Sequence, residues 1–375
     1  MLQYGARRLL TSIPVLVGIV VVVFVLARLI PGGACKAMLG EKATEAACER
    51  FDRANGLDKP VINCIKSVRP LRFGGCFVNP VETQLFIYAG QLLRGDFGQS
   101  IRFSRPVSII LVEQIPTTIE LSLAALALAV LIGVPAGILS AIRHNSAVDI
   151  ATMAGANIGV SMPVFWLGLM LAFLFSIVIP ILPPSGRISA GLTAEPFYQV
   201  WGLYLAKGTA IYTLLEFFSN LYILNSILTL DFEVLFDVLK HLILPAAALS
   251  TIPLSIIARM TRSSLLEVLG QEYIRAAKAK GVPRVRLVVR HALRNALLPV
   301  VTIIGLSLGG LLGGAVLTET VFKLSGVGRI LFEAITARDY PIIQAFTLVI
   351  AVSYVVINMI VDISYSYLDP RIRLQ

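Results

Sequence analysis

Six long apolar stretches separated by polar segments constrain this chain more than any other feature. A helix of about 20 apolar residues crosses the hydrocarbon core of a bilayer. Only 14% of the residues are charged and 57% are hydrophobic, whereas soluble domains carry about a quarter charged residues. We therefore expect an all-α integral membrane protein with six transmembrane helices. The expected spans are residues 9–30, 117–142, 151–182, 241–260, 297–317 and 342–363.

The distribution of positive charge predicts how these spans are oriented. The formal net charge of +10 is concentrated at the ends of apolar stretches, a pattern that favours orientation in a membrane over nucleic-acid binding. Arg7 and Arg8 precede the first span, and residues 263–294 carry about five net positive charges. Basic loops stay on the cytoplasmic side. Both termini and this loop are therefore expected on the cytoplasmic side of the membrane. The first apolar stretch is long enough to remain as a span.

The basic loop at residues 263–296 predicts one short helix, from residue 271 to residue 280. Glu272 lies in its first turn and Lys278 in its last, as the helix dipole favours. Gly281 then supplies a left-handed stop. The small side chains of this helix would allow another protein surface to approach closely: Ala276, Ala277 and Ala279. From composition alone, a solvated basic loop that only sets the topology is an equally good interpretation.

All four cysteines lie in one polar segment of mixed charge, residues 31–116, which is expected outside the cell: Cys35, Cys48, Cys64 and Cys76. Because the medium there is oxidising, two disulfides are expected, and four cysteines allow three pairings. Four free thiols are a less favoured alternative. A zinc site is disfavoured further, since the segment has no C-x-x-C motif and no nearby histidine.

Two further features concern the membrane segments. Ser161 and Pro163 form a Ser-x-Pro step that is expected to kink or unwind the third span and to line a pathway, although a kink for packing fits equally well. Residues 183–240 form a second external region. Its stretch 211–230 is long enough to span, but a span there would place the basic loop outside. We therefore expect one helix lying on the outer membrane surface.

The motifs resemble those of ABC-importer permeases, and most closely the first-permease type of the peptide (dipeptide, oligopeptide and nickel) branch. The branch pattern Tyr-x-Arg-x-Ala-x-Ala-Lys-Gly, followed by His-x-x-Arg-Asn-x-x-x-Pro, is matched at Tyr273, Arg275, Ala277, Ala279, Lys280, Gly281, His291, Arg294, Asn295 and Pro299. Arg275 replaces the leading Glu of the general "EAA" loop, as is usual in this branch. Ser325 stands where the family has Pro. The resemblance covers nearly the whole chain except residues 61–83 and much of 193–220.

The extra residues 61–83 carry Cys64 and Cys76. This predicts an external insertion that disulfides connect to the family's usual outer segment. The resemblance further implies residues 1–30 as the N-terminus and first span, residues 31–116 as the outer segment, and residues 117–375 as the permease core of a type I importer.

The resemblance also implies that the short helix is a coupling helix that docks on a separate ATPase subunit. The residues expected at that contact are Glu272, Tyr273, Arg275, Ala276, Ala277, Lys278, Lys280 and Gly281. No catalytic residue, cofactor or metal is expected. The sequence contains no G-x-x-x-x-G-K-[ST] phosphate loop, so ATP hydrolysis is expected in partner subunits.

The implied function is ATP-driven alternating access for dipeptides or oligopeptides. The expected partners are a second homologous permease, two ATPase subunits, an external solute-binding protein and membrane lipid. Two other interpretations stay open: an ion-coupled secondary transporter or channel, and a permease for another cargo such as a nickel chelate or glutathione. The first needs ionisable residues at mid-membrane, whereas the charges here lie near the ends of the apolar stretches. The three histidines fall on different membrane faces by this topology, which gives no support to an intramembrane enzyme.

Overall fold

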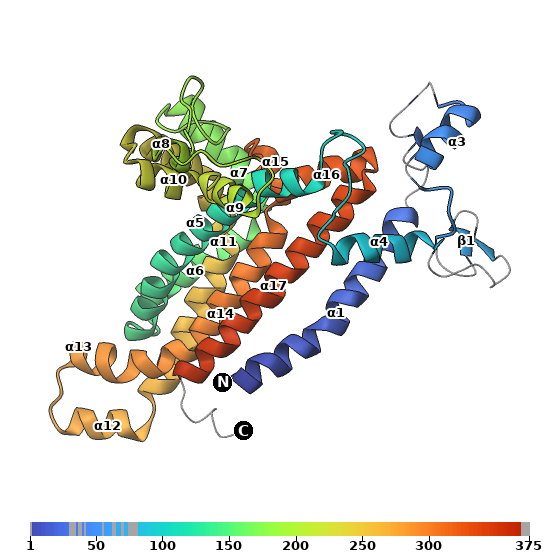
Figure 1. Cartoon of the computed structure of the whole chain (residues 1–375). Coiled ribbons are helices and arrows are strands. Elements are labelled where there is room, and N and C mark those ends of the chain that lie inside the picture. The colour runs from blue at the N-terminus through green and yellow to red at the C-terminus, as the bar shows by residue number, and fades with distance from the viewer. Residues whose placement is uncertain are drawn as a thin grey trace. The chain divides into compact units, whose positions relative to one another are not determined.

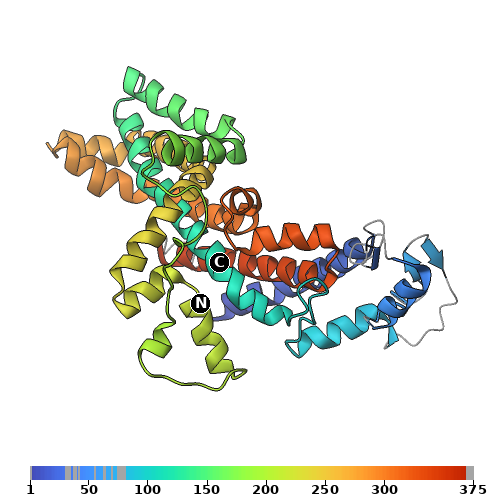
Figure 2. The same cartoon turned by 90° about the horizontal axis from the view of Figure 1, so that it is seen from above.

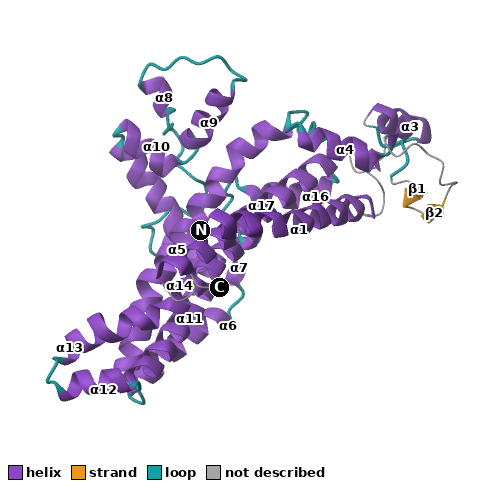
Figure 3. Ribbon diagram, turned by 60° about the horizontal axis from the view of Figure 1, so that its bottom comes forward, coloured by secondary structure: helices purple, strands orange, loops and turns teal. Residues whose placement is uncertain are grey.

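Among the residues that the structure describes, helices make up nearly all of the regular structure in the computed structural model, with one short antiparallel hairpin of β1 (Ile65–Val68) and β2 (Leu71–Phe73) (Figure 3). The expected all-α class is thus confirmed, apart from that hairpin. The structure describes residues 2–29, 35–36, 40, 43–54, 56–61, 65–68, 71–73 and 82–368. The chain forms two compact units, residues 1–5, 116–328 and 353–375 in the first and residues 6–115 and 329–352 in the second.

The first unit holds the long helices that carry the basic loop between them. Its elements in chain order are α5 (Val107–Ile142), α6 (Ala147–Ser161), α7 (Val164–Ala172), the π-helix η3 (Phe173–Val178), α8 (Phe197–Val200), α9 (Ala210–Ser219), α10 (Tyr222–Thr229), α11 (Phe232–Leu269), α12 (Glu272–Ala279), α13 (Arg284–Arg286), the π-helix η4 (Leu287–Ala292), α14 (Leu293–Gly314), α15 (Val316–Val321) and the end of α17 (Tyr340–Leu368). Helix α5 begins in the second unit, and α17 begins there as well.

The core of the first unit forms where α5, α11 and α14 pack together. Leu121 of α5, Leu244 of α11 and Leu311 of α14 are buried in one apolar cluster. Glycine permits the closest approach: a Cβ atom on Gly137 would lie 2.5 Å from the carbonyl oxygen of Ala258. Helix α5 runs unbroken through this glycine. The close contact therefore depends on a missing side chain, and the helix itself is regular.

Small residues also bring α14 and α17 together. A Cβ atom on Gly309 would lie 2.7 Å from the ring of Tyr354, and one on Gly305 would collide with Val361. Such small-residue contacts are common where transmembrane helices pack, because they let two backbones approach. Gly305 and Gly309 therefore serve packing with a neighbouring helix of the same chain.

The second unit contains α1 (Leu2–Leu29), α3 (Glu45–Ala54), the β1–β2 hairpin, α4 (Gln84–Leu93), α16 (Val327–Ala337) and the first turns of α17. Asp339, at the turn between α16 and α17, is fully buried. Its carboxylate accepts hydrogen bonds from the Ser100 hydroxyl at 2.5 Å and from the backbone N–H of Arg102 at 3.0 Å. This acid therefore fixes the loop before α5 to the start of α17.

The candidate spans agree with the expected six when one bent pair of helices counts as a span. Five described helices are long and apolar enough to cross a membrane, residues 10–28, 107–142, 232–269, 284–313 and 340–361. The pair α6 and α7–η3 passes the same test with a bend of 99°. A second bent pair, α9 and α10, also passes it.

The prediction of a single helix at residues 211–230 is wrong, because α9 and α10 meet there at 94°. Helix α9 ends at Ser219, and the side chain of Asn220 donates a hydrogen bond to the Glu216 carbonyl at 3.0 Å. The next helix starts with the backbone N–H of Ile223 bonded to the Glu120 carboxylate at 2.7 Å. An acid from α5 thus caps the second helix and fixes the corner.

Candidate functional site at the α12 end of the first unit

The short helix expected in the basic loop is present as α12. It begins after Gln271, ends before Lys280, and has Glu272 in its first turn and Lys278 in its last. Gly281 then adopts φ +78°, a left-handed conformation that side chains disfavour. Figures 1 and 2 show α12 beside the α13–η4 segment as a hairpin at one end of this unit. The predicted boundaries of the helix are therefore confirmed.

One apolar side chain holds α12 in place. Within this fully described helix Ile274 alone is buried, with 3% of its surface exposed. It packs in a cluster with Leu265 of α11, Leu287 of η4 and Ala141 of α5, and Ala277 is half-buried beside it. Burying an isoleucine side chain stabilises by about 1.5–3 kcal/mol. Ile274 therefore attaches the helix to an apolar core that α5, α11 and η4 share.

The opposite face of α12 is open. Most residues expected at a partner contact are exposed, either in α12 or directly after it: Glu272, Tyr273, Arg275, Ala276, Lys278, Lys280 and Gly281. The Arg275 guanidinium and Glu272 carboxylate are 3.0 Å apart, with 69% and 86% of the side chains exposed. Such an exposed pair contributes at most about 1 kcal/mol, so it does not prevent either residue from binding a partner. The face combines a positive charge with small alanine side chains.

Two hydrogen bonds link the hairpin to the long helices. Asn295 of α14 donates from Nδ2 to the Tyr273 hydroxyl at 2.8 Å. Arg284 donates from Nη2 to the backbone carbonyl of Ile142 at 3.0 Å, which satisfies a carbonyl at the end of α5. A displacement of α12 would therefore be passed to α14 and α5 as well as to α11.

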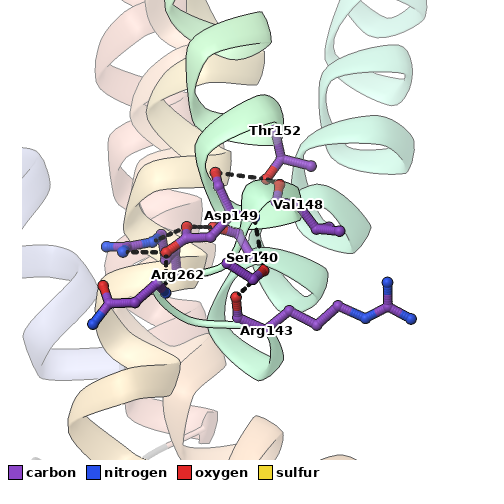
Figure 4. A network of polar contacts seen from close by, with 8 residues as sticks. Ser140, Arg143, Val148, Asp149, Thr152 and Arg262 are labelled. Carbon is purple, nitrogen blue, oxygen red and sulfur yellow. Dashed lines mark hydrogen bonds and ion pairs between the residues drawn. The ribbon is translucent and has the colours of Figure 1, made fainter.

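An ion pair between Arg262 and Asp149 joins α11 to α6 in the first unit (Figure 4). Arg262 donates from Nε and Nη2 to the two carboxylate oxygens of Asp149 at 2.7 and 2.8 Å. The Asp149 side chain is 5% exposed and that of Arg262 is 27% exposed. Two parallel charge-assisted bonds fix both position and orientation. We call this pair the Asp149–Arg262 clamp.

The same carboxylate organises the turn between α5 and α6. Ser140, from the last turns of α5, donates its hydroxyl to Asp149, and the backbone N–H of Asn145 donates to it at 3.0 Å. Asn145 has φ +57°, a conformation that asparagine tolerates better than most residues. One buried acid therefore joins α5, the turn, α6 and α11.

Sequence reasoning missed this clamp, although it left a signal. Neither Asp149 nor Arg262 belongs to a motif or a candidate site that the sequence predicts. Asp149 is the single acid between Arg143 and the end of α6, on a flank of the membrane that is otherwise positive. A carboxylate isolated in that setting is costly to bury without a cationic partner.

The Ser-x-Pro step lies at the break between α6 and α7. Helix α6 ends at Ser161, whose hydroxyl donates to the Asn157 carbonyl at 3.0 Å, and Pro163 precedes α7. Proline lacks an N–H and disfavours the helical conformation of the residue before it. The bend thus has a local cause. A role for Ser161 and Pro163 in lining a pathway stays a prediction.

Two buried acids lie elsewhere in the first unit. Glu319 of α15 is fully buried and accepts a hydrogen bond from the Thr118 hydroxyl at 2.6 Å. A Cβ atom on Gly326 would collide with the Glu319 carboxylate. Glu120 of α5 and Arg187 are 2.7 Å apart, with side chains 6% and 12% exposed. Each acid has a specific partner, so both are explained as structural contacts.

The outer cysteines are placed in part. Cys35 and Cys48 form a disulfide with a Cα–Cα distance of 5.4 Å, whereas Cys64 and Cys76 lie outside the described residues. The predicted connection of the insertion to the outer segment is wrong, because Cys35 and Cys48 of that segment bond to each other. Over the described residues, no three His, Cys, Asp or Glu side chains are grouped to hold a metal ion.

Comparison with known sequences assigns nearly the full length of the chain. Residues 133–374 match the family described as the binding-protein-dependent transport system inner membrane component, and residues 1–123 match the N-terminal part of such a membrane component. The chain is similar to the dipeptide transport system permease protein of Alkalihalophilus pseudofirmus, at 42% identity over 373 residues covering all of both chains.

Two other relatives are similarly complete. The di/tripeptide transport system permease protein of Pseudomonas aeruginosa is 38% identical over 377 residues, and the oligopeptide transport system permease protein of Bacillus subtilis is 35% identical over 374 residues. Both alignments cover all of both chains. The chain therefore belongs to the family of inner membrane components of binding-protein-dependent transport systems.

Proposed function

We propose that this protein is a permease subunit of an ABC importer that moves dipeptides or oligopeptides across the cytoplasmic membrane. Full-length relatives named as peptide permeases support the cargo class. The observation that carries the mechanism is the open, positively charged face of α12, held on a buried Ile274 and linked to α5, α11 and α14. Such a helix is suited to receive force from another protein and pass it to the spans.

In this proposal α12 and both termini are cytoplasmic, and two ATPase subunits dock on α12 and on its counterpart in a second, homologous permease. ATP-driven closure of the ATPases moves α12. The Asp149–Arg262 clamp keeps α6 moving with α11 as the spans change between inward- and outward-open states. Alternating access of this kind depends on a partner that binds one state more tightly than the other. An external solute-binding protein delivers the peptide.

The test uses a bulky residue on the open face of α12. Ala276 is exposed, so Ala276→Trp leaves the packing of Ile274 intact while blocking close approach of a partner. We expect this variant to lose co-purification of the ATPase and ATP-dependent uptake of a labelled dipeptide. Ala210→Trp, at an exposed alanine of α9, is the matched control and should keep both.

The alternatives make different forecasts for the same assays. Uptake that continues in membranes depleted of ATPase subunits would favour a secondary transporter or channel over an ABC permease. A third outcome is uptake that depends on the ATPase but is competed only by a nickel chelate or glutathione, and not by dipeptides. That result would show an ABC permease whose cargo is not a peptide of the proposed class. Unchanged ATPase binding by Ala276→Trp would refute the role of α12.

A further inference from the structure

A cavity of about 360 Å³ lies in the second unit, at the end of α1. Polar side chains from α1, α4, the start of α17 and the segment after α3 line it, among them Arg28, Lys59, Gln84, Tyr88, Tyr340 and Gln344. The coupling machinery lies in the first unit and uses none of these residues. The cavity therefore calls for an explanation of its own.

Two side chains that line the cavity each carry a buried polar atom that has no hydrogen-bond partner among the described residues. The side chain of Gln344 is 5% exposed, and its Nε2 atom makes no hydrogen bond. The buried hydroxyl of Tyr88 likewise has no partner. Burial raises the pKa of Tyr88 to about 12, so its hydroxyl stays protonated at neutral pH. Leaving a buried donor unsatisfied costs about 1–3 kcal/mol, which a bound acceptor would recover.

Arg28 and Lys59, the two charged side chains among the described residues that line the cavity, are both positive, so the cavity favours binding of an anion. Arg28 donates from Nε to the Gln84 side-chain oxygen at 2.7 Å and from Nη1 to the Phe24 carbonyl at 3.2 Å. Its guanidinium lies 3.5 Å from the centroid of the Phe24 ring. Within the described part of the chain, Arg28 has no carboxylate partner and no acid lines the cavity. Lys59 adds a second positive charge.

The position of Arg28 indicates where the anion comes from. Arg28 closes the apolar span 10–28 of α1, which places it where hydrocarbon gives way to polar headgroups. The side chains of Val22 and Leu26, six and two residues before it, are each 55% exposed, so the exposed apolar surface of α1 reaches close to Arg28. Tyr88 and Tyr340 add the aromatic groups that favour this interface. We propose that this cavity binds the phosphate group of a phospholipid whose acyl chains lie along the exposed apolar face of α1.

The test is retention of lipid by the full-length protein. The protein is purified in detergent and delipidated, and phosphatidylglycerol is added back and counted by native mass spectrometry. We expect the unmodified protein to retain lipid, and Arg28→Gln and Gln344→Leu each to weaken retention about tenfold or more, as expected for loss of one hydrogen bond to a charged group. Arg94→Gln removes an exposed arginine at the end of α4 and should retain lipid normally.

Gel filtration and the thermal midpoint establish that each variant is folded. If Arg28→Gln fails this check, Gln344→Leu, which removes no charge, decides the question. Equal lipid retention by all variants would overturn the proposal. Displacement of the lipid by inorganic phosphate at similar concentration would show a site for free anions, and displacement by dialanine would assign the cavity to cargo; either result would also overturn it. The assay involves no transport, so its outcome is independent of the proposed import function.

Discussion

Breaking the Asp149–Arg262 clamp from one side should be among the most damaging single changes in this protein. Arg262→Met keeps much of the apolar stem of the side chain but removes both bonds to Asp149, at 2.7 and 2.8 Å. The carboxylate is then left 5% exposed with no cation. The carboxylate keeps its bonds from Ser140 and Asn145 but loses both charge-assisted ones, so the folding equilibrium constant should fall by about tenfold or more.

Thermal unfolding in detergent measures this effect, and two further variants interpret it. Arg259→Met removes an exposed arginine less than one turn away on α11 and should be almost neutral. The double variant Asp149→Leu with Arg262→Met removes both charges, so it should be more stable than Arg262→Met alone, because no charge remains buried. Equal midpoints for Arg262→Met and Arg259→Met would refute the reasoning. A double variant with a lower midpoint than Arg262→Met alone would refute it as well.

Substitutions at three other places in the structure are tested by thermal midpoint. Gly326→Ala places a methyl group against a buried carboxylate and should cost about 1–3 kcal/mol, whereas Gly310→Ala, with open space around it, should cost nothing. Cys35→Ser should lose about 2–4 kcal/mol through its disulfide, and Cys48→Ser the same amount; unequal losses would contradict the pairing. Gly281→Ala forces a side chain into φ +78° and should cost about 1–2 kcal/mol, and an unchanged midpoint would show that the turn relaxes.

The sequence predicts features that depend on neighbouring residues. The ends of α12 follow from Glu272 in the first turn, Lys278 in the last and Gly281 after it, all within ten residues. The apolar spans follow from length and composition. The break before Pro163 follows from a missing N–H. Each of these effects acts within a few turns of the chain, so a single sequence contains the whole signal.

Contacts between distant residues could not be predicted in this way. Asp149 and Arg262 are 113 positions apart, and Thr118 and Glu319 are 201 apart. Charge alone shows that a buried acid needs a partner, but several arginines were available to it. The cysteines present the same difficulty, because four allow three pairings and spacing does not choose among them.

The corner between α9 and α10 shows how a distant contact overrides a local pattern. Residues 211–230 are apolar enough to suggest one continuous helix. Glu120 of α5 bonds to the backbone N–H of Ile223 and to Arg187, and the Arg187 guanidinium lies 3.7 Å from the centroid of the Tyr222 ring. These contacts fix a helix start within the apolar stretch. The energy that decides the geometry comes from a residue about 100 positions earlier.

Site-directed photo-crosslinking from the exposed face of α12 tests the central claim most directly. A photoreactive phenylalanine analogue at position 276, and the same group at position 210 of α9 as the control, are irradiated in intact membranes, and the crosslinked products are identified by mass spectrometry. The account predicts an ATPase subunit crosslinked from position 276 and none from position 210. The account would be contradicted if the crosslinked products from position 276 contained no ATPase subunit. It would also be contradicted if an ATPase subunit were crosslinked from position 210 instead.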